Sequence, residues 1–189
     1  MNKDCYTRAE ATAEAIRGHQ TGELVPRVAI VLGTGLGALT DVINVESTIP
    51  YIDLDGFPEP TVETHSGQLI IGTIEGTPVV VMQGRFHRYE GYSLQEVTFP
   101  IRVLSLLKAE TLVVTNVSGG MNPLWGVGEL VLLDDHINLL GDSPLVGPND
   151  DRFGPRFPDM SEPYDLSLIH ISEPTRRYAI AYAVCCLKK

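Results

Sequence analysis

The chain has 189 residues, 43% of them hydrophobic, and its 24 acidic against 14 basic residues give a net charge of -10 at pH 7. This size and composition fit one domain with a buried core, and no apolar run approaches the roughly 20 residues of a membrane-spanning helix. The acidic balance opposes nonspecific binding to nucleic acid or anionic lipid. We therefore expect no nucleic-acid partner and no membrane association.

The ends of the chain carry few targeting or redox signals. No secretory or transit pattern is visible at the N-terminus, so a cytoplasmic location is expected. The three cysteines, Cys5, Cys185 and Cys186, lie near the two ends without metal-ligand spacing or a disulfide framework. We expect no metal site, no disulfide and a reducing compartment.

The first third of the chain reads as helix followed by strand. Alanine and isoleucine recur at helical spacing over Thr7–Arg17, and Val28–Gly33 is a short buried strand that opens into the glycine-rich turn GTGLG, residues 33–37. Such a turn can be a dinucleotide fingerprint, but the third glycine is not at the required spacing. The Thr34 hydroxyl and the turn's N–H groups suit phosphate better. This order of elements predicts an α/β protein.

Two apolar runs, QLIIGTI and TPVVVMQ, flank the dipeptide Glu75-Gly76 and predict an antiparallel β-hairpin. A short segment before it, THSG at residues 64–67, contains His65. Taken alone, His65 is more simply interpreted as an ordinary loop histidine than as a ligand.

The segment GRFHRYEGY, residues 84–92, directly follows the second strand of this hairpin. Because alternate side chains beyond a strand point the same way, Arg85, His87 and Tyr89 are expected to converge on one pocket. A guanidinium fork, an imidazole and a phenol suit an anion beside a sugar better than a metal. The simpler alternative is a surface turn in which Arg85 and Glu90 are solvated.

The middle of the chain predicts one helix and two strands. Ser93 and Glu96 form a capping-box pattern at the start of an amphipathic run, in which Pro100 should cause a kink or mark a second start. Thr111–Asn116 is a buried strand that ends in the turn VSGG, and ligands gather at such strand ends in open α/β sheets. LVLLDDHINLL, residues 130–140, is a further strand candidate, and Pro144–Pro163 has the composition of a long irregular loop.

The last 24 residues resemble a sequence foreign to the protein. A transposase-type sequencing adaptor translates residue for residue as Leu166–Arg176, and Tyr182–Lys189 resembles the far end of the same adaptor. Such segments are left out of fold reasoning. We expect residues 1–165 to be the N-terminal part of a single domain and 166–189 to be a non-native tail, with an ordinary C-terminal strand and helix as the alternative.

Seven motifs between about Val28 and Asp165 resemble the trimeric class of purine nucleoside phosphorylases: GTGLG, HSGQL, MQGRFHRYEGY, TFPIRVL, VTNVSGGMNP, DHINL and GPND…RFPDMSEPYD. The resemblance implies a nucleoside phosphorylase fold, with a mixed central β-sheet flanked by helices. It also implies reversible phosphorolysis of purine ribonucleosides and deoxyribonucleosides, without metal or organic cofactor and with inorganic phosphate as co-substrate. Members of the class are homotrimers and longer than this chain, so we expect the C-terminal half, which reads the base, to be missing and the fragment itself to be inactive.

The resemblance also implies roles for individual residues. The phosphate-binding residues would be Thr34, where family members often have Ser, the N–H of Val117, where Ala is more usual, and His65, Arg85 and His87; the last two would be catalytic. The nucleoside-binding residues would be Tyr89 at the ribose, Asn116 near the base, and Phe157 covering the sugar of a neighbouring subunit. Two alternatives remain open: a noncatalytic module that binds nucleoside or phosphate, and a dehydrogenase that uses GTGLG.

Overall fold

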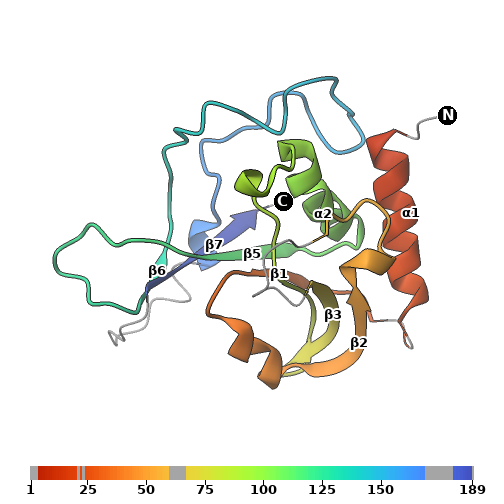
Figure 1. Cartoon of the computed structure of the whole chain (residues 1–189), viewed down its shortest axis with the longest axis horizontal. Helices are drawn as coiled ribbons and strands as arrows, with labels where there is room; N and C mark the ends of the chain where they lie inside the picture. Colours follow the sequence, from red (N-terminus) through yellow and green to blue (C-terminus); the bar gives the residue numbers. More distant parts are fainter. Residues whose placement is uncertain (1–3, 21, 23, 60–66, 169–180, 189) are drawn as a thin grey trace.

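The computed structural model describes residues 4–20, 22, 24–59, 67–168 and 181–188. In this part of the chain seven strands form one mixed sheet in the order β2-β3-β4-β1-β5-β7-β6 (Figure 1). The strands are β1 (Val28–Leu32), β2 (Asn44–Pro50), β3 (Gln68–Ile74), β4 (Thr77–Gln83), β5 (Thr111–Val117), β6 (Glu129–Leu132) and β7 (Ala181–Lys188). β4, β1 and β5 are parallel neighbours, whereas β3 is antiparallel to both β2 and β4. The predicted α/β class with a mixed sheet is confirmed.

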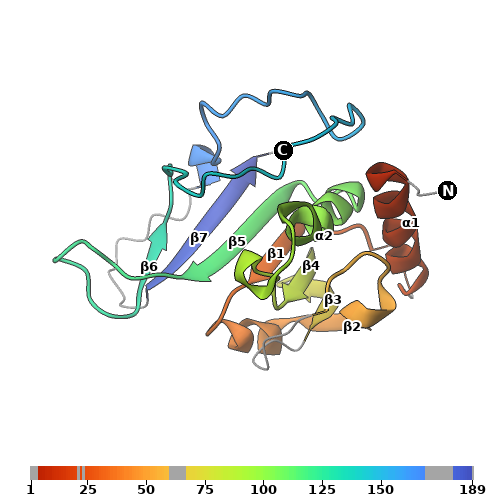
Figure 2. The ribbon, with the colours of Figure 1, turned by 45° about the horizontal axis from the view of Figure 1, so that its top comes forward.

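Two α-helices, α1 (Cys5–Gly18) and α2 (Leu94–Leu106), cover one face of the sheet (Figure 2). Side chains at alternate strand positions, such as Ala29 and Val31, pack with both helices in the larger hydrophobic cluster. The intervening positions, such as Ile30, face the other side and pack with residues next to the 3₁₀ helix η1 (Gly37–Val42). Burial on both faces explains why these parallel strands are nearly continuous apolar runs. No described helix has the length and apolarity to cross a bilayer.

The sequence signal at the start of α2 is confirmed, and of the two effects predicted for Pro100, a kink or a second start, the second start is excluded. Ser93 caps the helix: Glu96 N–H donates to Ser93 Oγ at 3.2 Å, and Ser93 N–H donates to Glu96 Oε2 at 2.7 Å. The prediction of a second helix start at Pro100 is wrong, because α2 is one continuous helix through Pro100. Phe99, Pro100 and Val103 are all buried, so packing of this face outweighs the hydrogen bond that proline removes.

The chain between β6 and residue 165 is irregular, as predicted for Pro144–Pro163. The predicted strand over residues 130–140 is wrong beyond Leu132, where β6 ends. Ile137 and Leu139 beyond that point are 87% and 89% exposed. Apolar character alone therefore does not make a strand here, because these side chains meet no partner surface in the described structure.

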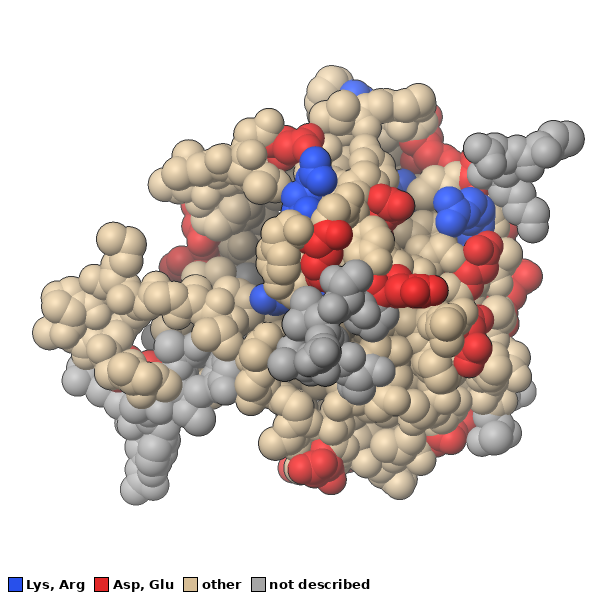
Figure 3. Space-filling model, in the orientation of Figure 1, with Lys and Arg blue, Asp and Glu red and all other residues tan. Residues whose placement is uncertain are grey.

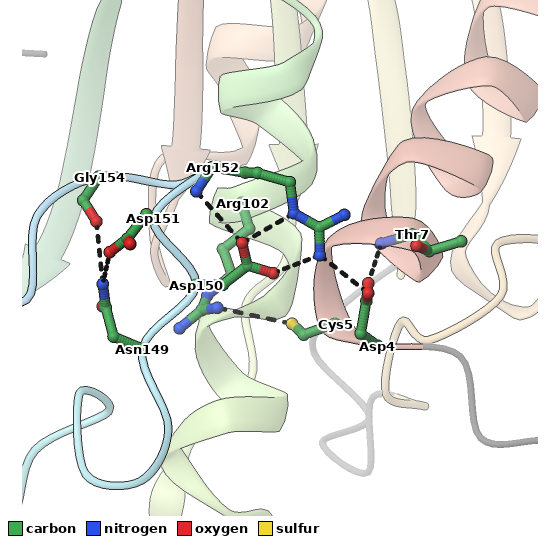
Figure 4. Close-up of polar contacts among 9 residues, drawn as sticks. All are labelled: Asp4, Cys5, Thr7, Arg102, Asn149, Asp150, Asp151, Arg152 and Gly154. Carbon is green, nitrogen blue, oxygen red and sulfur yellow. Dashed lines mark hydrogen bonds and ion pairs between the residues drawn. The ribbon is translucent and has the colours of Figure 1, made fainter.

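A cluster of polar and charged side chains links the irregular segment to α1 (Figure 4). The Arg152 guanidinium bonds Asp150 through two nitrogens, at 2.8 and 2.6 Å, and lies 2.8 Å from Asp4 at the start of α1. It also lies 4.3 Å from the centroid of the Tyr6 ring, which contacts Phe153. The segment around residues 149–154 is thus held at a defined place although it forms no regular element.

The C-terminal residues 181–188 form β7, which pairs antiparallel with β5 and parallel with β6. Strand pairing uses backbone groups, which are the same for any sequence. The pairing therefore leaves the origin of residues 166–189 open, and the division of the chain after residue 165 stays a prediction.

Candidate active site

The candidate site lies where three neighbouring parallel strands end at the same edge of the sheet. β1 runs into the turn at residues 33–35, β4 runs into Gly84 and Arg85, and β5 ends at Val117. The ends of β1 and β4 are level, since Leu32 lies opposite Gln83, and β5 continues to Val117 past its last pair with β1. Ligands of open α/β sheets bind at such carboxyl ends.

The turn after β1 lies tight against β5. Gly33 N–H donates to Thr115 Oγ1 at 2.8 Å, and a Cβ atom on Gly33 would lie 2.6 Å from the Thr115 carbonyl oxygen. Only glycine fits there, and Gly35 two residues on has a φ of 89°, which also favours glycine. Thr34 lies between them and is exposed, as a side chain that meets a ligand from solvent must be.

Arg85 is held on two sides, by the segment that follows it and by β5. Its Nε donates to His87 Nε2 at 3.1 Å, and its Nη1 donates to the Thr115 carbonyl at 2.7 Å. The side chain also lines a cavity of about 410 Å³ whose other walls are mostly apolar, including Phe86, Val114 and Leu145. Partial burial lowers the pKa of Arg85, while the nearby Tyr89 acts weakly in the opposite direction. Arginine stays charged at neutral pH. The positive charge of Arg85 therefore lies in a partly buried position, where water screens its attraction for an anion less than at the surface.

His87 is oriented by Glu90, a residue that sequence reasoning did not identify as functional. Glu90 Oε1 accepts from His87 N–H at 2.8 Å and lies 2.7 Å from Nδ1. The Glu90 side chain is only 2% exposed, so the alternative in which Glu90 is solvated is wrong. With Nε2 accepting from Arg85, Nδ1 carries the proton toward Glu90. The spacing of three residues between His87 and Glu90, which matches a helix cap, was the available signal.

Tyr89 completes the predicted group, by a different geometry from the one expected. Phe86 is 4% exposed and packs in the core, whereas Arg85 and His87 on either side of it are only partly buried, as expected for side chains that alternate along a strand. Tyr89, however, lies in the 3₁₀ helix η3 (Arg88–Glu90), and its ring stacks on the His87 ring at 4.6 Å between centroids. Tyr89 is 76% exposed and lies near both His87 and Arg85.

The remaining predicted residues are less closely connected to this group. Asn116 and Val117 form the end of β5, next to Thr115, and Val117 is 53% exposed. Phe157 is 88% exposed in the irregular segment, and in the described structure it makes no ring contact with His87 or Tyr89. His65 lies outside the described residues. The described residues also contain no group of three His, Cys, Asp or Glu suited to a metal ion.

Tyr51 holds the backbone just before Arg85 in place, a role that the sequence did not predict. This residue begins the 3₁₀ helix η2 (Tyr51–Asp53), is 1% exposed, and its hydroxyl donates to the Gly84 carbonyl at 2.8 Å. Its ring packs against Phe57 and Phe86. Burial raises the pKa of the Tyr51 phenol, so the hydroxyl remains a donor. Gly84 has a φ of 106°, and this bond fixes the backbone directly before Arg85.

The sequence model of the phosphorylase superfamily matches residues 27–181 of this chain. The chain belongs to the phosphorylase superfamily. It is 51% identical over 148 residues to purine nucleoside phosphorylase 1 of Bacillus subtilis, covering 78% of this chain and 55% of that protein. It is 49% identical over 170 residues to the purine nucleoside phosphorylase of Rattus norvegicus, covering 88% of this chain and 58% of that protein.

Solved structures agree with these sequence relatives. Isoform 2 of purine nucleoside phosphorylase from Schistosoma mansoni, in complex with cytosine and ribose-1-phosphate, superposes with a TM-score of 0.78 at 42% identity. The superposition covers 88% of this chain and 59% of that one. The chain thus spans little more than half the length of the relatives that it matches.

Proposed function

We propose that this chain is the N-terminal part of a longer purine nucleoside phosphorylase, hereafter the full-length protein. The observation that carries the proposal is the Arg85–His87–Glu90 arrangement at the sheet edge, in a chain about 50% identical to proteins of that name. The reaction is reversible phosphorolysis of purine ribonucleosides and deoxyribonucleosides.

In this reaction a phosphate oxygen attacks the anomeric carbon of the nucleoside while the bond from that carbon to the purine nitrogen breaks. The electron pair of the broken bond leaves with the purine, which takes up a proton in place of the one that hydrogen phosphate gives up, and the sugar becomes a pentose 1-phosphate. Because the sugar gains positive charge as the bond breaks, a phosphate held beneath it stabilises the transition state. The charge of Arg85 in turn holds the phosphate, with no metal needed.

The residue roles follow from the resemblance and from the contacts at the site. We assign the phosphate to Thr34, His65, Arg85, His87 and the N–H of Val117. Glu90 keeps the His87 ring oriented through the bond to Nδ1, which leaves Nε2 on the side of Arg85. His87 can donate to the phosphate only through a protonated Nε2, so phosphate binding replaces the bond from Arg85 Nε to this nitrogen. The nucleoside is assigned to a second set of residues: Tyr89, Asn116 and Phe157.

The full-length protein is further proposed to be a cytoplasmic homotrimer. Support for the trimer comes from Phe157, whose ring is 88% exposed and free to cover the sugar of a neighbouring subunit. The acidic side chains spread over the face seen in Figure 3 agree with the expected absence of a nucleic-acid partner. Light scattering measures the trimer directly, and a monomeric active enzyme contradicts it.

The 189-residue chain alone is proposed to lack turnover, because more than a third of the length of its relatives has no counterpart in it. Residues 166–189 are proposed to be foreign to the gene. Resequencing the locus decides this point: a frame that continues with other residues after Asp165 supports the proposal, and a genomic LSLIHISEPTR refutes it.

The decisive experiment is an assay of the full-length protein with inosine or guanosine and inorganic phosphate. We expect free base and ribose 1-phosphate in equal amounts, formed only when phosphate is present. Calorimetric titration with phosphate covers the noncatalytic alternative, for which binding without bond cleavage is the signature. Absence of product from a folded full-length protein refutes the phosphorylase assignment.

A further inference from the structure

Thr115 connects three parts of the candidate site that lie far apart in the sequence. Its Oγ1 accepts from Gly33 N–H at 2.8 Å and donates to the Val31 carbonyl at 3.1 Å. Its own carbonyl accepts from Arg85 Nη1 at 2.7 Å. With an exposure of 3%, this residue makes all three bonds out of contact with bulk water.

These bonds occur where the ladder between β1 and β5 stops. The last paired residues are Val31 and Val114, and Thr115 is the next residue of β5. A hydroxyl can accept one hydrogen bond while donating another. Thr115 therefore replaces the backbone pairing with side-chain bonds at the point where the chain leaves β1 to form the turn around Thr34.

No other acceptor can readily replace the hydroxyl. The Gly33 Cα approaches β5 so closely that even a methyl group would lie 2.6 Å from the Thr115 carbonyl oxygen. A water molecule needs more room than that and two or more polar partners. Without the hydroxyl, Gly33 N–H is left buried and unpaired, and the turn moves away from β5.

We propose that Thr115 is the positioning residue of the phosphate site. Its hydroxyl fixes the Gly33–Gly35 turn, and its carbonyl fixes the Arg85 guanidinium, so that both are placed for one phosphate ion. This assignment rests on the proposed phosphorylase function. In the described structure the hydroxyl and carbonyl of Thr115 bond Gly33, Val31 and Arg85, so we expect an effect on phosphate and none on the nucleoside.

The test is Thr115→Val in the full-length protein, which keeps the shape and removes the hydroxyl. We expect KM for phosphate to rise about tenfold, as one lost buried hydrogen bond implies, with KM for inosine unchanged. Thr115→Ser restores the hydroxyl and should recover the phosphate KM. Thr111→Val, at the opposite end of the same strand, is the matched control and should leave both constants unchanged. A purely structural role lowers the melting temperature without moving the phosphate KM, and that result overturns the proposal.

Amide hydrogen exchange tests the same bond without any substrate, in the full-length protein. We expect the Gly33 amide to be protected in the wild type and in Thr115→Ser, and to exchange about tenfold faster in Thr115→Val. A wild-type Gly33 amide that exchanges as fast as an unprotected one overturns the proposal even if the valine variant does not fold. Absence of phosphorolysis by the full-length wild type refutes the proposed function instead, and leaves the exchange measurement to decide the placement of the turn.

Discussion

In the full-length protein, the phosphate held by Arg85 stabilises the transition state. Replacing Arg85 by alanine should remove most of this stabilisation. An arginine has five N–H donors, and Arg85 uses two of them within the chain, for His87 and for Thr115. Three donors are left for a ligand, enough for a bidentate contact with phosphate. The two internal bonds also hold the fork in one orientation before the ligand arrives, so its binding needs little reordering.

The magnitude follows from comparable donors to a developing charge. Losing one such donor costs about 2.7–4 kcal/mol in the transition state, which is about 100- to 1,000-fold in kcat/KM. Arg85→Lys keeps the charge but not the fork, so we expect it to recover only part of this loss. The assay is inosine phosphorolysis with phosphate varied at saturating nucleoside.

Arg88→Ala is the matched control for this prediction, because Arg88 is an exposed arginine three residues further along that bonds the Tyr92 carbonyl. It should retain nearly full activity. Wild-type kcat/KM in Arg85→Ala, or equal losses in the two variants, removes Arg85 from the site and with it the reasoning about phosphate.

Three further predictions concern groups around the site and the N-terminus. Glu90→Gln keeps an oxygen for both bonds to His87 but removes the charge, so we expect kcat/KM of the full-length protein to fall about tenfold; full activity would mean that geometry alone suffices. Tyr51→Phe leaves a buried carbonyl unpaired and should lower the free energy of unfolding, measured in urea, by about 1–2 kcal/mol; an unchanged value contradicts the support role. The bond from Thr7 N–H and the contact with Arg152 lower the pKa of Asp4 from 3.8 to about 2. Its charge therefore stabilises the fold above pH 3.8 and ceases to as the pH falls through about 2, so the difference in melting temperature between wild type and Asp4→Asn should vanish near pH 2 and not persist below it.

Local signals in the sequence predicted the elements whose causes are local. The hairpin is an example: Glu75 and Gly76 both adopt positive φ, at 48° and 78°, which is the conformation that a two-residue turn between twisted strands requires. The capping box of Ser93 and Glu96 likewise depends on residues three apart. The second helix start predicted at Pro100 is wrong because the continuation of the helix depends on burial against the sheet, which no local pattern contains.

Contacts across long sequence distances explain what was missed at the site. Thr115 is 82 residues from Gly33 and 30 from Arg85, and an ordinary threonine in an apolar strand carries no mark of either bond. Glu90 appeared as one acid in a polar turn, and only the tertiary structure reveals that its carboxylate is buried. Arg85 and His87 were predictable because both follow one strand, so that strand geometry already places them on one side.

The residues assigned to phosphate differ from Phe157, which is assigned to the nucleoside, in how firmly the chain holds them. Those assigned to phosphate, apart from His65, lie at or shortly after the ends of β1, β4 and β5, and the sheet, Thr115 and Tyr51 fix the backbone there. Phe157, assigned to the nucleoside, lies in a segment held to the body by the exposed Arg152 cluster, and exposed ion pairs contribute little stability. The phosphate half of the site therefore depends on the core that this chain forms itself. Phe157 would act through a neighbouring subunit of the proposed trimer, and for this reason we expect substitutions at Arg85 or Thr115 to act on phosphate and those at Phe157 to act on the nucleoside.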